Sequence, residues 1–213
     1  MAPQADHVEA SLPAAPSEPC YVLFPKDIQN NSPVGGKARA LADLDTMELP
    51  IPPWCVVVPQ AFDASLTTVQ RAALAQTQDI EAIRRVVAEV VASAEVAAAI
   101  DAAATRIGVG GELAVRSSAL GEDSAEHSFA GQLESYLFVA PEAAAETVAR
   151  VWRSGFSERL LAYRQEAGLP LLPMPPAVIL QRVVNGEVSG VAFSADPVSG
   201  QRGIAVVAAV PGL

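Results

Sequence analysis

The spacing of apolar residues divides the chain into short runs typical of strands and longer segments with helical period. Short apolar runs predict strands at 21–24, 54–58, 112–116 and 135–139. Helical spacing predicts helices at 37–47, 79–107 and 141–167. Within the second of these, Ser93 is placed to cap a second helix that ends at Gly108. Pro141 suits the first turn of the third, which Gly168 closes.

The last part of the chain has the pattern of a β structure. After a proline-rich stretch at 170–176, apolar runs predict strands at 177–184, 189–194 and 203–209. Asn185-Gly186 is a strong hairpin signal between the first two of these runs. Asp196 to Gly200 has the residues of a turn that leads to the third. The pattern predicts an α+β protein, with a mixed α/β part followed by an antiparallel part.

These patterns also predict how the chain is organised into domains. Residues 1–19 combine prolines with Ala, Ser and acidic residues and lack periodicity, so we expect a disordered leader. Residues 20–169 would form a first subdomain. The linker and the start of a second, incomplete subdomain would follow at 170–213.

Composition and charge narrow the possible functions. The 213 residues carry 24 acidic against 14 basic side chains, a net charge of −10, which argues against binding to nucleic acid or to anionic membranes. No apolar stretch is long enough to span a membrane, and the basic region of a signal peptide is missing before Lys26. Cys20 and Cys55 form no metal or redox motif, so we expect reduced, partly buried thiols in a soluble, cytoplasmic protein.

The first candidate for chemistry is the sequence Val-Gly-Gly-Lys at 34–37. Two glycines let a backbone approach a ligand closely, and amides at the start of a helix favour anions. Lys37 would add a mobile charge suited to phosphate. The spacing is not that of a Walker A loop. Taken alone, this signal is weaker than the simpler interpretation of a glycine turn with a solvated lysine.

A second candidate lies at 114–118, where an apolar strand delivers Arg116 at its end, followed by Ser117 and a second hydroxyl. A guanidinium offers a planar fork to phosphate. Pairing of Arg116 with Glu122 or Asp123 is an equally good local explanation. The next segment, 121–131, has small residues and terminal glycines that suit a mobile lid over phosphates.

Together these segments resemble a known family. The sequences at 34–37, 114–119 and 128–132, and Ser189 to Pro197 further along, are similar to the N-terminal nucleotide-binding domain of phosphoenolpyruvate synthase and pyruvate phosphate dikinase. Rifampicin phosphotransferase shares this domain. The resemblance covers about residues 21–213, in order and with family-like spacing. One departure is Leu120-Gly121, which stands where the family usually has Thr-Ala.

The resemblance implies an ATP-grasp fold, with ATP held between two α+β subdomains. It implies that Lys37 and Arg116 bind the phosphates and act in catalysis, and that Gly131 closes the lid. It also implies that Ser135 lies near the nucleotide and Gln181 beside the adenine. The local chemistry of the strand end adds Ser117 to these ATP-binding residues.

By the same resemblance, the complete enzyme would move the β-phosphate of ATP to a histidine on another domain, then to pyruvate or a similar acceptor, and release AMP. Neither His7 nor His127 matches the carrier histidine; His127 is more simply a solvated loop residue. The magnesium ligands would lie beyond Leu213. The partners would then be ATP, a phosphocarrier histidine domain and an acceptor-binding domain.

Two alternatives remain at this point: the same domain of a rifampicin-type antibiotic phosphotransferase, and a non-catalytic module that senses nucleotide or binds a partner. We expect residues 1–213 alone not to turn over ATP, and steady formation of AMP would overturn this. We also expect self-association through an unpaired strand edge at 204–209.

Overall fold

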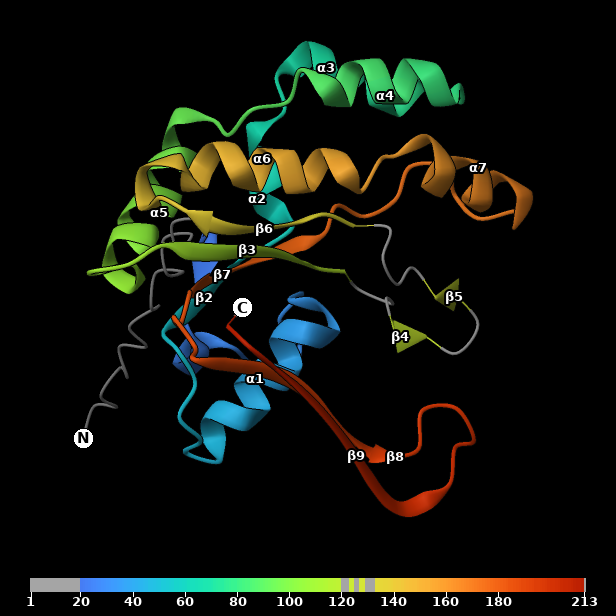
Figure 1. Ribbon diagram of the computed structural model, residues 1–213. Helices are drawn as coiled ribbons and strands as arrows, with labels where there is room; N and C mark the ends of the chain where they lie inside the picture. Colours follow the sequence, from blue (N-terminus) through green and yellow to red (C-terminus); the bar gives the residue numbers. More distant parts are fainter. Residues whose placement is uncertain (1–19, 120–122, 125–126, 129–132, 213) are drawn as a thin grey trace, which may run out of the picture.

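The centre of the molecule is a five-stranded antiparallel sheet in the order β1-β2-β7-β3-β6 (Figure 1). It is seen in a computed structural model, which describes residues 20–119, 123–124, 127–128 and 133–212. The strands of the sheet are β1 (Val22–Leu23), β2 (Trp54–Val57), β3 (Leu113–Ser118), β6 (Ser135–Val139) and β7 (Ala177–Arg182). All five overlap apolar runs for which the sequence predicts strands.

One face of the sheet is covered by a layer of helices, which lies above the sheet in Figure 1. These are α2 (Gln60–Ser65), α3 (Thr68–Gln76), α4 (Ile80–Ala88), α5 (Ala94–Ile107), α6 (Ala144–Ser154) and α7 (Glu158–Glu166). The Ser93 hydroxyl accepts from the Val96 amide and so caps α5, as predicted. The apolar stripes of these helices and alternate residues of the strands form the larger core.

The other face of the sheet packs against a single helix, α1 (Gly35–Thr46), which lies below the sheet in Figure 1. Val34 and Ala38 at the start of this helix join the second core together with Trp54, Val56 and Ile179 from the strands. Strand β2 is therefore buried on both faces, which explains its unbroken run of apolar residues.

The last two strands leave this sheet and form a separate hairpin of β8 (Val188–Ala195) and β9 (Arg202–Pro211). It lies on the same side of the sheet as α1 (Figure 1). The predicted turn at 196–200 is confirmed, because Asp196 Oδ1 accepts from the amides of Val198 at 2.8 Å and Ser199 at 2.9 Å. These bonds lower the pKa of the Asp196 carboxyl.

The hairpin predicted at Asn185-Gly186 is wrong. Strand β7, which precedes it, pairs with β2 and β3 instead of β8. A hairpin signal reports only the next run along the chain, whereas Val178 of β7 pairs with Val57 and Ser117, which lie 121 and 61 residues earlier. Strand β7 thus belongs to the central sheet, and the division into subdomains at 20–169 and 170–213 stays a prediction.

Several local expectations also change. The segment 141–167 forms a 3₁₀ turn, η2 (Pro141–Ala143), and then two helices, because Ser157 caps α7 where one long helix was expected. Helices α2 and α3 were not predicted. A second 3₁₀ turn, η1 (Pro25–Asp27), and the short paired strands β4 (Asp123–Ser124) and β5 (His127–Ser128) complete the described elements.

The two cysteines differ in their surroundings. Cys55 lies buried in β2, and burial raises the pKa of its thiol to about 12. Cys20 is exposed, so the expectation of a partly buried thiol is wrong for this residue, which stands before the first strand and outside either core. Across the described residues, no helix is both long and apolar enough to cross a membrane.

Candidate functional site

The start of α1 is held against the end of β3 by one serine. Ser118 Oγ accepts a hydrogen bond from the Ala38 amide at 3.0 Å and donates one to the Val34 carbonyl at 2.7 Å. The helix has no side-chain cap of its own at Val34. A hydroxyl from a strand about 80 residues away in the sequence thus bridges the Val34 carbonyl and the Ala38 amide at the start of the helix.

A glycine makes this close approach possible. Gly35 has φ +75°, and a Cβ on it would lie 2.2 Å from the Ser118 carbonyl oxygen. Any larger residue would therefore push the helix away from the strand. Gly35 thus allows the helix to contact the strand directly. This contact places Lys37, which is half-buried, near the end of β3.

Strand alternation places Arg116 on the same face of the sheet as α1. Arg116 pairs with Ile179, whose side chain belongs to the core under α1, and Arg116 itself is exposed. Ser135 is its direct partner on β6 and is also exposed. Residues directly opposite each other in a sheet share a face. Arg116 and Ser135 therefore lie side by side beyond the part of the sheet that α1 covers.

Gln181 extends the same face. It lies two residues beyond Ile179 on β7, and it pairs with Ala114 on one side and Trp54 on the other. This makes it a diagonal neighbour of Arg116, at a spacing of about 7–8 Å between backbones. The order along the sheet is the start of α1 at Ser118, then Arg116, then Gln181.

Ser117 does not join this group. It pairs with Val178, which faces the helix layer, and its side chain is 1% exposed. Within the described part of the chain its hydroxyl has no hydrogen-bond partner. Its hydroxyl therefore points to the opposite face of the sheet from Arg116. Gly131 lies outside the described residues, as do the side chains of Glu122 and Asp123, so their expected roles stay predictions.

The nearby cation Arg39 has a different task from Arg116. Its guanidinium donates to the carbonyls of Gln29 at 2.7 Å, Asn30 at 3.2 Å and Ser32 at 2.9 Å. These bonds fix the loop that enters α1, beside a hollow of about 450 Å³ along the start of the helix. Arg39 is thus used in holding the loop, whereas Arg116 is presented on an exposed position of a strand.

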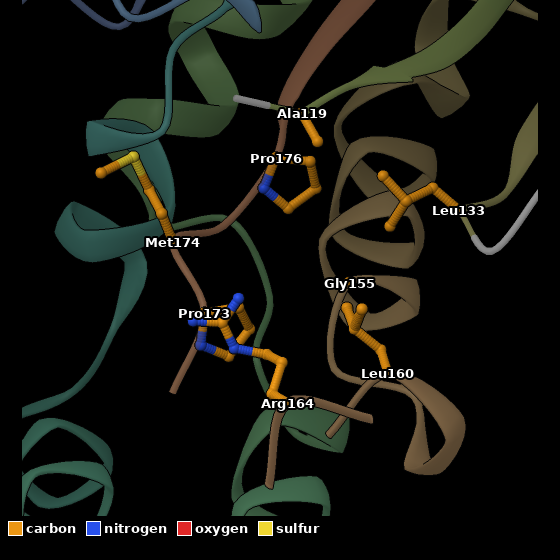
Figure 2. A pocket seen from close by; sticks show the side chains of 8 residues that line it. All are labelled: Ala119, Leu133, Gly155, Leu160, Arg164, Pro173, Met174 and Pro176. Carbon is orange, nitrogen blue, oxygen red and sulfur yellow. The ribbon is translucent and has the colours of Figure 1, made fainter. Parts of the chain in front are cut away.

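A second hollow, of about 230 Å³, lies where β3 ends at Ala119 and β7 begins after Pro176 (Figure 2). Its walls are apolar except for Arg164, whose side chain extends toward Pro173. Arg164 Nε donates to the Pro170 carbonyl at 2.8 Å, and burial lowers the pKa of the guanidinium. This pocket has one cation, already engaged with the backbone, so it suits an apolar group better than a chain of phosphates. The residues that line it are Ala119, Leu133, Gly155, Leu160, Arg164, Pro173, Met174 and Pro176.

Strand alternation alone could have separated the two serines of the sequence at 114–119. Once 113–118 is read as a strand, Arg116 and Ser118 fall on one face and Ser117 on the other. The role of Ser118 was missed because its partner, the start of α1, lies far away in the sequence. Three side chains on the same face therefore form a row: the guanidinium of Arg116, the hydroxyl of Ser135 and the amide of Gln181. The row ends at the start of α1, which carries Lys37. This arrangement suits a polyanion that carries a polar ring.

Comparison with known proteins decides the family. The profile described as "Pyruvate phosphate dikinase, AMP/ATP-binding domain" matches residues 31–213. The chain belongs to this family. The match includes every residue of the row just described, and it agrees with the resemblance found in the sequence.

Proteins similar to this chain carry different names. Rifampicin phosphotransferase of Streptomyces sviceus is 36% identical over 211 residues, which are 91% of this chain and 24% of the relative. A probable phosphoenolpyruvate synthase of Archaeoglobus fulgidus is 32% identical over 85% of this chain and 27% of its own length. The prodigiosin synthesizing transferase of Serratia marcescens is 34% identical over 84% of this chain and 20% of its own. The chain thus spans about a quarter of the length of these relatives.

Proposed function

We propose that this chain is the ATP-binding portion of a phosphotransferase of the dikinase type, with a phosphoenolpyruvate synthase-like enzyme as the leading form. The observation that carries the proposal is that Arg116 and Ser135 lie side by side on β3 and β6, on the face of the sheet that carries α1, and that Ser118, two residues from Arg116, binds the helix amide that follows Lys37. The family match to an AMP/ATP-binding domain supports a nucleotide as the ligand.

The order of groups along the sheet supports an orientation for ATP. In the proposal, the phosphates lie between Lys37 and Arg116, and the base lies beside Gln181. From Ser118 to Ala114, the partner of Gln181, the strand advances four residues, about 13–14 Å. This separates the cationic end of the site from the amide end. Ser135 would contact the nucleotide between them.

The two cations have a clear task in such a reaction. Phosphoryl transfer needs little covalent help from the protein, because catalysis consists mostly of positioning and of stabilising negative charge. Lys37 would hold phosphate oxygens as a point charge and Arg116 as a planar fork. Gly131 would close a lid over them. In the complete enzyme, the β-phosphate would pass to a histidine of another domain and then to the acceptor, with release of AMP.

The acceptor is where the alternatives differ. Relatives of similar identity are named as transferases of rifampicin and of prodigiosin synthesis and as phosphoenolpyruvate synthases. Proteins similar to this chain thus carry names that point to different acceptors. Pyruvate remains our leading acceptor. The alternative is an antibiotic of the rifampicin type, and the 36% identity to rifampicin phosphotransferase favours that alternative. A non-catalytic nucleotide sensor is the third possibility.

The proposal also covers the complete enzyme and its location. It includes an ATP-grasp arrangement with a second subdomain, a carrier-histidine domain, an acceptor-binding domain and a cytoplasmic location. In the described part of the chain, no group of three or more His, Cys, Asp or Glu residues could hold a metal ion. As the resemblance implies, the proposal places the magnesium ligands beyond Leu213, and we expect residues 1–213 alone not to turn over ATP.

Titration calorimetry with ATP tests the proposal at Arg116. We expect Arg116→Ala to weaken ATP binding about 10- to 100-fold, because a charge-assisted hydrogen bond contributes about 1.5–3 kcal/mol. The matched control is Arg85→Ala, on helix α4 of the opposite layer, which should bind ATP like the parent. Equal affinity of the Arg116 variant and the parent would overturn the site, and a parent without ATP binding would overturn the function for this chain.

A further inference from the structure

We infer that Ser118 is a positioning residue, which sets Lys37 at the correct place relative to Arg116 for binding of the triphosphate. The inference deepens the proposed function and rests on it. Ser118 would not contact the nucleotide itself. Its hydroxyl is completely buried and already bonded inside the protein, accepting from the Ala38 amide and donating its one hydrogen to the Val34 carbonyl.

The first step of the argument is that α1 lacks a local device to fix its start. Its N-cap residue is Val34, which offers no side-chain oxygen to the first turn. Serine, threonine, aspartate or asparagine usually fill this position. Here Ser118 on β3, which is completely buried, binds both the Val34 carbonyl and the Ala38 amide, the two backbone groups that begin the bonding of the helix. The start of the helix is consequently fixed to the strand and not to its own loop.

The second step is that both cations are close in sequence to this junction. Lys37 immediately precedes Ala38, whose amide Ser118 binds, and Arg116 stands two residues before Ser118 on the same face of the strand. The contact at Gly35 allows no spacer between helix and strand. A shift of the start of α1 would therefore move Lys37 while Arg116 stays in the sheet.

The third step is that a phosphate chain needs both cations at once. A site that binds one ligand through two groups loses affinity when the distance between these groups changes. Small displacements of positioned groups have large effects at such sites. Removal of the Ser118 hydroxyl should therefore weaken ATP binding without removing any group that touches ATP. It should act through Lys37.

The test measures ATP affinity by titration calorimetry for the parent and for the variants Ser118→Ala and Ser117→Ala. We expect Ser118→Ala to weaken binding about tenfold. Ser117→Ala is the matched control, since this neighbouring serine is equally buried but faces the helix layer and has no hydrogen-bond partner within the described residues. It should leave the affinity unchanged.

A double-mutant cycle separates positioning from general damage to the fold. If Ser118 acts through Lys37, then Ser118→Ala should cause little further loss in a Lys37→Ala background. Equal fold-losses in both backgrounds would overturn the inference, because a merely structural defect would act regardless of Lys37. Wild-type affinity for Ser118→Ala would overturn it as well. A parent that does not bind ATP would overturn the proposed function, and with it this inference.

A second pair of variants covers the case in which Ser118→Ala does not fold. Ser118→Thr and Ser118→Val have nearly the same shape and differ in the hydroxyl. We expect the threonine variant to bind ATP about tenfold more tightly than the valine variant. Equal affinities of these two proteins would contradict the inference.

Discussion

Strands β2 and β9 are built from the same kinds of residue but have opposite surroundings. Strand β2 is buried along its whole length, whereas β9 is exposed almost throughout. Val57 in β2 is 0% exposed, and Val207 in β9 is 71% exposed. The difference lies in what covers them: helices on one side and α1 on the other side of the central sheet, and no comparable layer over the hairpin within the described residues.

The register of the hairpin shows that β8 and β9 carry apolar residues on both of their faces. Val191 faces Ala208 and Phe193 faces Val206 on one side, while Val207 lies on the other. Residues 188–195 and 203–211 contain no charged side chain. Apolar residues on both faces are typical of strands that are covered on both faces. The hairpin thus has the sequence of an interior strand pair in an exposed position, and we expect the two regions to respond differently to substitution.

The largest difference should appear in stability. Leu180→Ala, at a fully buried position of β7, should lower the free energy of unfolding by about 2–5 kcal/mol, because it leaves a cavity in the core. Val207→Ala should change it by at most about 0.5 kcal/mol. Urea unfolding followed by circular dichroism checks both. A loss of several kcal/mol for Val207→Ala would mean that the hairpin is covered in solution.

A smaller effect should appear in self-association. The sequence predicted that the run at 204–209 lacks a neighbour, but β9 pairs with β8. Each strand still has one further edge, and the hairpin is apolar, so self-association between copies of this chain stays our prediction. Val207→Lys should lower the average mass seen by light scattering at high concentration, since charge on an exposed strand discourages pairing.

The control for this experiment is Val69→Lys on helix α3. Val69 is 79% exposed but lies away from the hairpin, so its replacement should leave the mass unchanged. A parent that remains monomeric at all concentrations would contradict the prediction. An equal change in both variants would show that association uses net charge and not the hairpin.

The same comparison shows what the sequence could predict. Apolar runs located every strand of the central sheet, and Ser93 and Asp196 marked a helix cap and a turn correctly. Pairing of β7 was missed because hairpin signals report neighbours in sequence, whereas β7 joins strands that are distant along the chain. Local pattern thus gave the elements, and long-range packing decided how they pair.

In the candidate site, too, local pattern identified some residues, and long-range packing decided the position of others. Lys37 and Arg116 were found from local chemistry, and Gln181 from resemblance, and strand register puts Arg116, Ser135 and Gln181 on one face. Ser117 was chosen because it follows Arg116, but alternation turns it to the other face. Ser118 was overlooked because its partners lie across the fold, at the start of α1.

The most direct test of the account is an ATP titration of the two lysine variants, since Lys26 and Lys37 are the only lysines of the chain. Lys37→Ala should weaken ATP binding at least tenfold through loss of a phosphate contact. Lys26→Ala, in the exposed turn η1, should bind like the parent. Equal affinity of the Lys37 variant and the parent, with and without magnesium, would contradict the phosphate site at the start of α1.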